Sequence, residues 1–267
     1  MELNQMFGFL LAVLVGITLG LIGSGGSILA VPIMVYVFGI NPVLATAYSL
    51  FIVGTSALVG GFKKAKQNLV NFKMVFVFGL PTILMLFATR KFIVPFIPDI
   101  IYINDFEFAK PLLLLILFAI VMIMASFSMI KPNNDKLTTN ENVYKLNYLI
   151  ILLVGISIGF IAGLVGAGGG FLIVPSLVLL ARLPIKTAVG TSLFIIAFQS
   201  LIGFGADLWV QNFIDWPFLL IFSSLSIIGI FIGHFFSKTI DSNKLKVSFG
   251  WFVLTIGVLI IIKELVF

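Results

Sequence analysis

Long apolar runs recur along almost the whole chain, and they restrict its fold more than any other feature. The sequence is 61% hydrophobic and only 10% charged, whereas a soluble domain carries about 25% charged residues. A membrane-spanning helix needs about 20 mostly apolar residues. Segments of this kind lie at 7–38, 43–62, 72–89, 111–130, 147–181, 187–206, 216–236 and 247–266. The chain is therefore predicted to be an all-α integral membrane protein, a polytopic helical bundle without a soluble domain.

Two glycine-rich breaks interrupt the two longest of these segments. The first break reads Gly-Ser-Gly-Gly-Ser over residues 23–27, and the second reads Gly-Ala-Gly-Gly-Gly over residues 166–170. The apolar pieces after the breaks, 28–38 and 171–181, are too short to cross a bilayer core of about 30 Å as single helices. We therefore expect about eight long segments, or ten if both segments are split, with each short piece either crossing or turning back inside the membrane.

The two halves of the chain match each other without a gap over residues 16–52 of the first half. Six glycines and prolines of the first half recur 143 positions later: Gly16, Gly20, Gly23, Gly25, Gly26 and Pro32 correspond to Gly159, Gly163, Gly166, Gly168, Gly169 and Pro175. The same offset places Ser49 on Ser192, and a later shift of one residue places Arg90 on His234. Such a match indicates internal duplication. We expect two transmembrane repeats, 1–130 and 147–267, joined by a polar linker at 131–146.

Loops at equivalent places in the two repeats carry opposite charge. The loop after 43–62 has Lys63, Lys64, Lys66 and Lys73, whereas its counterpart has Asp207 and Asp215. An odd number of crossings in each repeat puts most basic residues on one side and most acids on the other, in accordance with the positive-inside rule. This favours inverted repeats. The segment 90–110, with two prolines and three acids, is predicted to be an aqueous loop.

Composition excludes several classes of function. The net charge of +6 is explained by basic residues in loops beside apolar spans, so no nucleic-acid partner is expected. Without cysteine and with one histidine, the chain offers no thiolate chemistry and no metal cluster, and no paired carboxylates lie within the spans. We expect no enzymatic activity, metal or cofactor. The first residues lack the basic region of a signal peptide, so the first apolar segment is expected to be part of the folded protein and not a cleaved signal.

The glycine breaks are the best candidates for a substrate site. Unshielded backbone at membrane depth is tolerated only where it lines a cavity or is buried in protein. The helix restarting after each break presents free amides and the positive end of its dipole, which favour an anion. The candidate residues are Gly23, Ser24, Gly25, Gly26, Ser27, Gly166, Gly168, Gly169 and Gly170. A second interpretation is that these glycines only allow close packing of helices.

Polar residues inside the spans extend this candidate site. Ser49, Thr191, Ser192 and Gln199 are predicted to line the path, although serine and threonine in membrane helices often bond only to backbone carbonyls. Arg90 and His234 lie near predicted span ends and are interpreted as interfacial. Because ionisable groups within the spans are scarce, a proton-coupled mechanism is not favoured. The negative interior potential assists anion exit by about 2.3 kcal/mol per charge per 100 mV, which favours a passive or weakly coupled exporter.

The paired motifs resemble those of a known family. The stretches from Gly20 to Pro32, from Gly163 to Pro175 and from Ala188 to Ser192 are similar to the sulfite exporter TauE/SafE family of membrane permeases. The resemblance implies a secondary transporter in a bacterial-type cytoplasmic (inner) membrane that exports small sulfur-containing anions such as sulfite or organosulfonates. The first half departs from the pattern at Tyr48. The alternative is a non-transporting accessory or structural membrane subunit.

Overall fold

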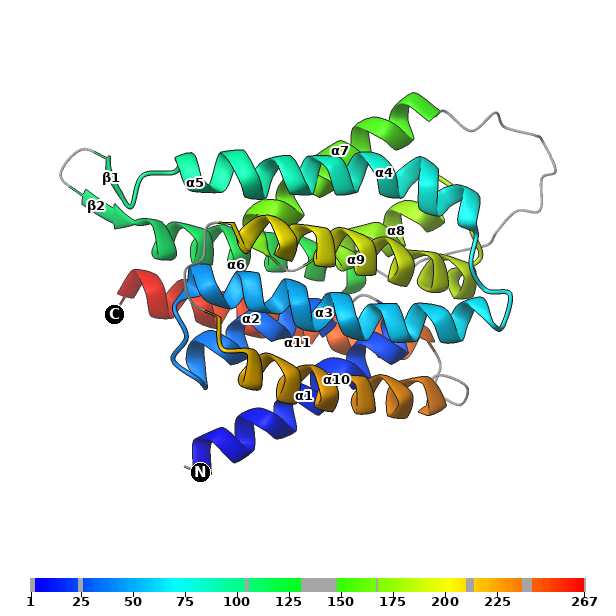
Figure 1. Ribbon diagram of the computed structural model, residues 1–267, viewed down its shortest axis with the longest axis horizontal. Coiled ribbons are helices and arrows are strands. Elements are labelled where there is room, and N and C mark those ends of the chain that lie inside the picture. Colours follow the sequence, from blue (N-terminus) through cyan, green and yellow to red (C-terminus); the bar gives the residue numbers. More distant parts are fainter. Residues whose placement is uncertain are drawn as a thin grey trace.

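The fold is an elongated bundle of helices that run roughly along its long axis (Figure 1). The computed structural model describes residues 3–23, 26–103, 106–130, 148–166, 168–209, 214–236 and 242–266. The predicted linker at 131–146 lies outside the described residues, as do Ser24 and Gly25.

The first half of the chain contains seven helical elements and a hairpin. They are α1 (Leu3–Ile22), α2 (Gly26–Tyr36), α3 (Pro42–Ala65), α4 (Phe72–Ala88), the π-helix η1 (Thr89–Ile93), α5 (Val94–Phe96), β1 (Ile100–Ile103), β2 (Phe106–Ala109) and α6 (Lys110–Ile130). The second half contains α7 (Tyr148–Val165), α8 (Gly170–Leu179), α9 (Ile185–Asp207), α10 (Trp216–Phe236) and α11 (Ser242–Val266).

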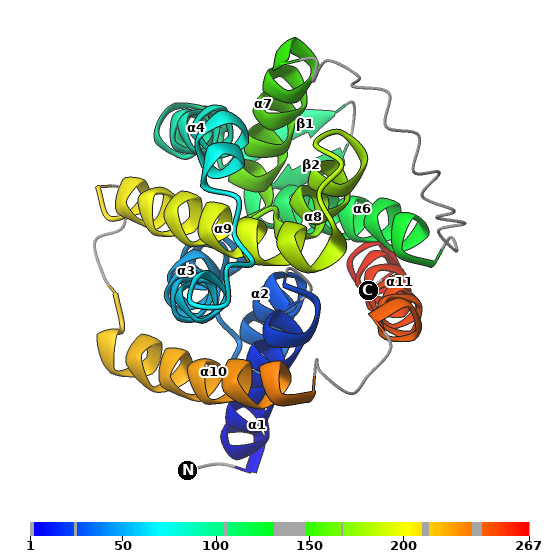
Figure 2. The same cartoon turned by 90° about the vertical axis from the view of Figure 1, so that its right-hand side faces the viewer.

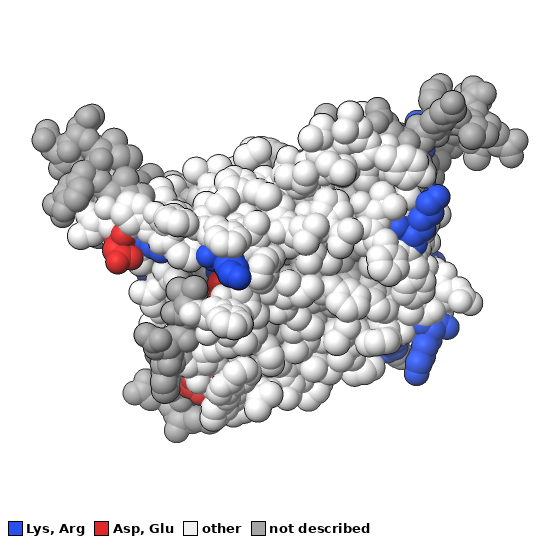
Figure 3. Space-filling model, turned by 45° about the horizontal axis from the view of Figure 1, so that its top comes forward, with Lys and Arg blue, Asp and Glu red and all other residues white. Residues whose placement is uncertain are grey.

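Among the described residues, six helices are long and apolar enough to cross a membrane. They are α3, the continuous stretch from α4 to α5, most of α6, α7, α9 and α10. Large apolar side chains such as Leu10, Phe76 and Met124 are exposed on the outside of the bundle. On the face shown in Figure 3, charged side chains lie at the two ends and uncharged surface lies between them. The prediction of a polytopic helical membrane protein is confirmed.

Both glycine breaks interrupt helices as predicted. The first separates α1 from α2, and the second separates α7 from α8. At 11 and 10 residues, α2 and α8 extend only about 15 Å at 1.5 Å per residue, half of the bilayer core. Helix α2 packs on α3, α8 packs on α9, and α2 and α8 contact each other. The two restarted helices therefore meet inside the bundle.

The prediction of an aqueous loop at 90–110 is wrong in its first part. Helix α4 continues through η1 to Phe96, and Arg90 is buried, with only 2% of its surface exposed. In sequence alone the charge indicates the end of a span, but Asp207 neutralises it, so the helix continues past it. The otherwise helical fold also includes one short antiparallel hairpin, in which β1 and β2 pair Ile100 with Ala109.

Helices α3 and α9 form the centre of the bundle and run in opposite directions (Figures 1 and 2). Over the most apolar 18 residues of each helix, 61% of α3 and 78% of α9 is buried inside the protein, compared with 39% of α7. Helix α1 packs mainly on α10, α7 on α4, and α6 on α11. The end of the bundle where α3 and α10 terminate is called the lysine end, because Lys63 and Lys64 lie there. The end where α9 terminates is called the aspartate end, because Asp207 lies there.

Candidate functional site

The second glycine break lies against the central helix α3. Gly166 has a φ of 72°, a conformation that residues with a side chain rarely adopt. A Cβ atom at this position would also collide with Thr46 and with Nη2 of Arg90. Only glycine allows the break, α3 and the arginine to approach each other so closely.

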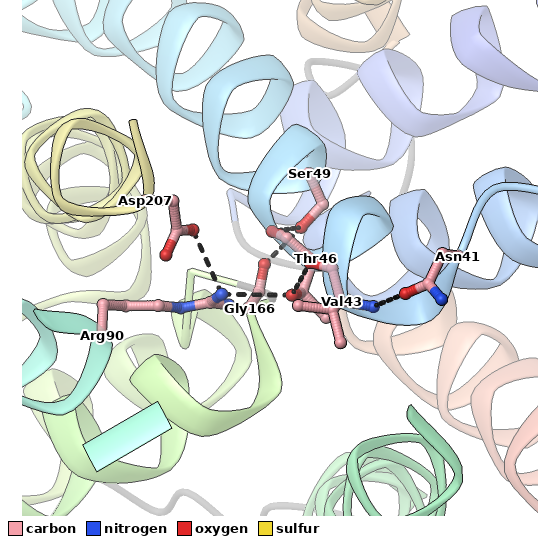
Figure 4. A network of polar contacts seen from close by, with 7 residues as sticks. All are labelled: Asn41, Val43, Thr46, Ser49, Arg90, Gly166 and Asp207. Atoms are coloured by element: carbon pink, nitrogen blue, oxygen red, sulfur yellow. Dashed lines mark hydrogen bonds and ion pairs between the residues drawn. The ribbon is translucent and has the colours of Figure 1, made fainter. Parts of the chain in front are cut away.

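Hydrogen bonds connect this break to α3. The Ser49 hydroxyl donates to the carbonyl oxygen of Gly166, so two predicted site residues from different halves of the chain are in contact. Thr46 lies one turn earlier on α3; its hydroxyl donates to the Val43 carbonyl at 2.8 Å and accepts from Nη1 of Arg90 at 3.1 Å. Figure 4 shows these groups converging around the break.

A buried ion pair completes this cluster. Nη1 of Arg90, on η1, lies 3.1 Å from Oδ2 of Asp207 at the end of α9. The two residues are 2% and 6% exposed. Nε and Nη2 of Arg90 have no hydrogen-bond partner among the described residues. Two buried donor nitrogens of a guanidinium group therefore remain available beside Gly166.

Sequence reasoning missed this pair. The sequence pattern predicts an interfacial Arg90, a loop position for Asp207 and few ionisable groups within the spans. One signal was present: the apolar run resumes after Arg90 with Phe92, Ile93 and Val94. Because an apolar run on both sides of a charge indicates a buried charge, this pattern favoured a continuous helix.

Two side chains of α9 face the rest of the second break. Nε2 of Gln199 donates to the carbonyl oxygen of Gly168, and its Oε1 has no partner among the described residues. A Cβ atom at Gly168 would lie 2.6 Å from Oγ of Ser200, a hydroxyl that likewise has no partner there. Both side chains are fully buried. Polar groups from α3, α9 and η1 thus surround the break.

The remaining glycines of the second break take part through the backbone. Gly169 precedes α8 and lies beside Ala162 and the Gln199 amide. Gly170 is buried and begins α8. Apart from Ala167, which is not described, all the predicted residues of this break are therefore together.

The first glycine break has an apolar neighbour instead. Gly23 lies against the side chain of Val189 on α9, and Gly26 packs on α1 near the Val15 carbonyl and Thr18. Ser27 is fully buried. Val189 lies 143 positions after Thr46, the same offset that separates Gly23 from Gly166, so residues at matching positions contact the two breaks with different chemistry.

Two predicted residues have their described contacts elsewhere. The Thr191 hydroxyl donates to the Thr187 carbonyl at 2.7 Å and accepts from the Asn71 amide at 2.9 Å, so it anchors the loop before α4. The Ser192 hydroxyl donates to the Val189 carbonyl of its own helix. These hydrogen bonds satisfy backbone groups, as threonine and serine often do in membrane helices.

No metal site accompanies this cluster in the described part of the chain. No three acidic or histidine side chains gather there as a metal ion would require. The polar groups at the second break are one guanidinium, one paired carboxylate, hydroxyls and an amide. This set can bind an anion by charge and by N–H and O–H donation.

Membrane-spanning helices combined with broken helices and polar groups inside the bundle are typical of membrane transporters, and proteins similar to this chain are named accordingly. A probable membrane transporter protein of Xylella fastidiosa strain 9a5c is 29% identical over 93% of this chain and 91% of its own length. One from Methanocaldococcus jannaschii is 30% identical over 76% of this chain and 75% of its own. These names indicate a membrane transporter rather than an enzyme.

The family is shown by its sequence profile. The profile of the sulfite exporter TauE/SafE family matches residues 8–264, so the chain belongs to that family. No solved structure matches the chain significantly.

Proposed function

We propose that this protein is a secondary transporter that exports small sulfur-containing anions, such as sulfite or organosulfonates, across the cytoplasmic membrane. The observation that carries the proposal is Arg90, a buried guanidinium with two donor nitrogens without partners beside the second glycine break. Family membership supports the transport function, and the arginine supports the anionic class of the cargo.

The chemistry of Arg90 suits an oxyanion. A guanidinium presents its N–H groups as a rigid fork that matches two oxygens of an anion, and the strength of such charge-assisted bonds increases when water is excluded. A permanently charged group is costly inside a membrane and usually marks a substrate or ion path. We infer that Nε and Nη2 bind the anion, while Nη1 keeps its contacts to Asp207 and Thr46.

The predicted glycine and polar residues complete the site in this proposal. Gln199 and Ser200 supply further polar groups at Gly168, and the amides at the start of α8 add a positive helix end. The Ser49 hydroxyl holds the break in place by donating a hydrogen bond to the Gly166 carbonyl oxygen. The first break would contribute its amides from the opposite repeat.

We also infer that the two halves are inverted repeats, and the packing of the helices supports this. Helix α1 of the first half packs on α10 of the second, while α7 of the second half packs on α4 of the first. Gly16 faces the Ser226 carbonyl, and its counterpart Gly159 faces Thr82, the counterpart of Ser226. Helices α3 and α9 start at opposite ends of the bundle (Figure 1). Inverted repeats suit alternating access around a central site.

The test is binding and transport by the purified protein. A thermal-shift screen with sulfite, sulfate, sulfoacetate, taurine and simple carboxylates identifies the anion, and flux into liposomes then measures its movement. We expect Arg90→Gln to abolish binding and flux and Arg90→Lys to retain part of both. Lys91→Gln is the matched control, because Lys91 is the exposed neighbour of Arg90. Unchanged flux in Arg90→Gln contradicts the proposed site, and no response to any anion contradicts the anionic cargo.

A further inference from the structure

We propose that a groove between α2 and α11 is a binding site for one phospholipid with an ethanolamine headgroup, phosphatidylethanolamine. The groove has a volume of about 400 Å³, which is within the usual range of ligand pockets. Its lining includes Pro32, Ile33 and Tyr36 of α2 and Ile256, Leu259 and Lys263 of α11. The site is separate from Arg90, and the inference does not depend on the identity of the transported anion.

The groove is apolar along most of its length and open on the outer surface of the bundle. Apart from Tyr36 and Lys263, every residue that lines it has a hydrocarbon side chain. Leu259 is 57% exposed, so the groove faces the lipid. Ile256 lies about two helical turns before Lys263, a distance of about 10 Å along the axis. The groove therefore fits the first part of an acyl chain.

The two helices beside the groove have their main packing partners elsewhere. Helix α11 packs mainly on α6, and α2 packs on α1 and α3. Between α2 and α11 the protein side chains leave space that reaches the outer surface. Because contacts between atoms at close range stabilise a bundle in lipid, an acyl chain that fills this space supplies packing that the two helices do not give each other.

At one end of the groove, a single tyrosine contacts two opposite charges. Nζ of Lys263 lies 4.1 Å from the centre of the Tyr36 ring, and the hydroxyl of this ring donates to Oε1 of Glu264 at 3.0 Å. Tyr36 is the last residue of α2, and Lys263 lies in the last turn of α11. Tyrosine and lysine side chains near helix ends are typical of the level of the lipid headgroups.

These charges are complementary to an ethanolamine headgroup. Its phosphate is negative, and its ammonium group, two carbon atoms away, is positive and has N–H groups to donate. The ammonium of Lys263 can donate to the phosphate, and the carboxylate of Glu264 can accept from the ethanolamine ammonium. Phosphatidylglycerol has no cation for Glu264, and the quaternary ammonium of phosphatidylcholine has no N–H. The pair of charges therefore favours phosphatidylethanolamine over both.

The lipid would contact the helix that restarts after the first glycine break. Helix α2 begins at Gly26 and contains Pro32, which lines the groove. With 11 residues, α2 extends over only about half of the bilayer core. A lipid bound between α2 and α11 would therefore help to hold this short helix in place.

The experiment measures lipid binding to the purified full-length protein by native mass spectrometry in detergent. The probes are phosphatidylethanolamine, phosphatidylglycerol and phosphatidylcholine with identical acyl chains. We expect the wild type to bind phosphatidylethanolamine about tenfold more tightly than either of the others, the difference that accompanies one charge-assisted hydrogen bond.

Variants assign the two charges. We expect Glu264→Gln to lower the affinity for phosphatidylethanolamine about tenfold and to leave that for phosphatidylglycerol unchanged, whereas Lys263→Gln should lower both. Lys91→Gln is the matched control, because Lys91 is also an exposed lysine over aromatic rings but does not line the groove. It should bind all three lipids like the wild type.

A further variant tests the groove itself and does not depend on the charges. Leu259→Trp places a larger side chain at an exposed position of the lining, and we expect it to lower the affinity for all three lipids. Equal binding of phosphatidylethanolamine and phosphatidylcholine to the wild type, or tighter binding of phosphatidylglycerol, overturns the proposal. So does a dimer that Leu259→Trp dissociates without a change in lipid binding, because a second copy then occupies the groove. None of these measurements uses the anion, so their failure leaves the proposed function at Arg90 in place.

Discussion

At the scale of single residues, the most consequential pair is Arg90 and Asp207. Each charge alone would be costly in the interior of a membrane protein, and each is tolerated because the other lies 3.1 Å away. Among the described residues, the hydrogen bonds of the arginine are made by one nitrogen, to Asp207 and Thr46. The pair therefore stabilises the fold and at the same time leaves donor groups for a ligand.

Removal of the carboxylate charge tests this balance. Asp207→Asn leaves the buried Arg90 without its counter-charge, so we expect a loss of about 3 kcal/mol or more in the free energy of unfolding. The measurement is thermal unfolding in detergent. Asp99→Asn, at an exposed acid of the same end, should unfold like the wild type. Equal stability of the two variants would show that the ion pair is not formed in solution.

Gly168 gives a second prediction at this scale. Its φ of 65° and the nearness of Ser200 both oppose a side chain, so Gly168→Ala should cost about 1–2 kcal/mol of stability through backbone strain. Because the break holds the proposed site, we expect anion flux in liposomes to fall by more than the stability loss explains. Gly205→Ala is the control, since a Cβ at Gly205 has no neighbour within 4 Å. Normal flux in Gly168→Ala would remove the second break from the site.

At the scale of elements, the two halves of the chain are held together by close crossings of long helices. Helix α1 meets α10 at Gly16, and α7 meets α4 at Gly159. In both places the backbone of the partner helix occupies the space of a side chain. Since lipid offers no hydrophobic driving force between helices, such close packing carries much of the association.

Large side chains at these crossings should prevent assembly. A Cβ at Gly16 would collide with the Ser226 carbonyl, and one at Gly159 with the Thr82 carbonyl. Backbone cannot move aside as a flexible side chain can, so we expect Gly16→Leu and Gly159→Leu to lose most monodisperse protein in gel filtration after detergent extraction. Gly205→Leu should elute like the wild type. Normal elution of both crossing variants would contradict the packing described here.

At the scale of the whole molecule, the bundle has chemically different ends. On the face shown in Figure 3, one end displays only basic side chains, whereas the other displays both signs. The acid–base pair of Arg90 and Asp207 lies at the aspartate end, and a small cavity lined by Lys63, Lys64 and His234 lies at the lysine end. The two ends therefore differ in charge although the two halves of the chain have similar sequences.

The orientation can be tested directly, because the chain has no cysteine. Lys66 follows α3 and Trp209 follows α9, and both are exposed. We expect Lys66→Cys to react with a membrane-impermeant maleimide only from the cytoplasmic side and Trp209→Cys only from the outside. The readout is labelling of intact cells compared with inverted vesicles. Labelling of both positions from one side would refute the inverted arrangement.

The helical membrane fold and both glycine breaks could be predicted because they depend on local properties. Apolar runs set the spans, and Gly166 and Gly168 require conformations that few other residues adopt. Arg90 was misread for the same reason: in isolation a charge marks a span end, and only its partner in another helix makes it an interior residue. The hairpin at β1 and β2 was missed because two strands of four residues give little periodicity.

The sequence by itself determined that this chain enters a membrane, that its longest helices break at glycine, and that its motifs match one transporter family. Those properties depend on residues that are neighbours in the sequence, so they can be predicted without knowledge of tertiary contacts. Only the tertiary structure decided that Arg90 meets Asp207 and that Ser49 and Gln199 hold the second break. These contacts join residues far apart in the chain, and only packing brings the residues together away from water.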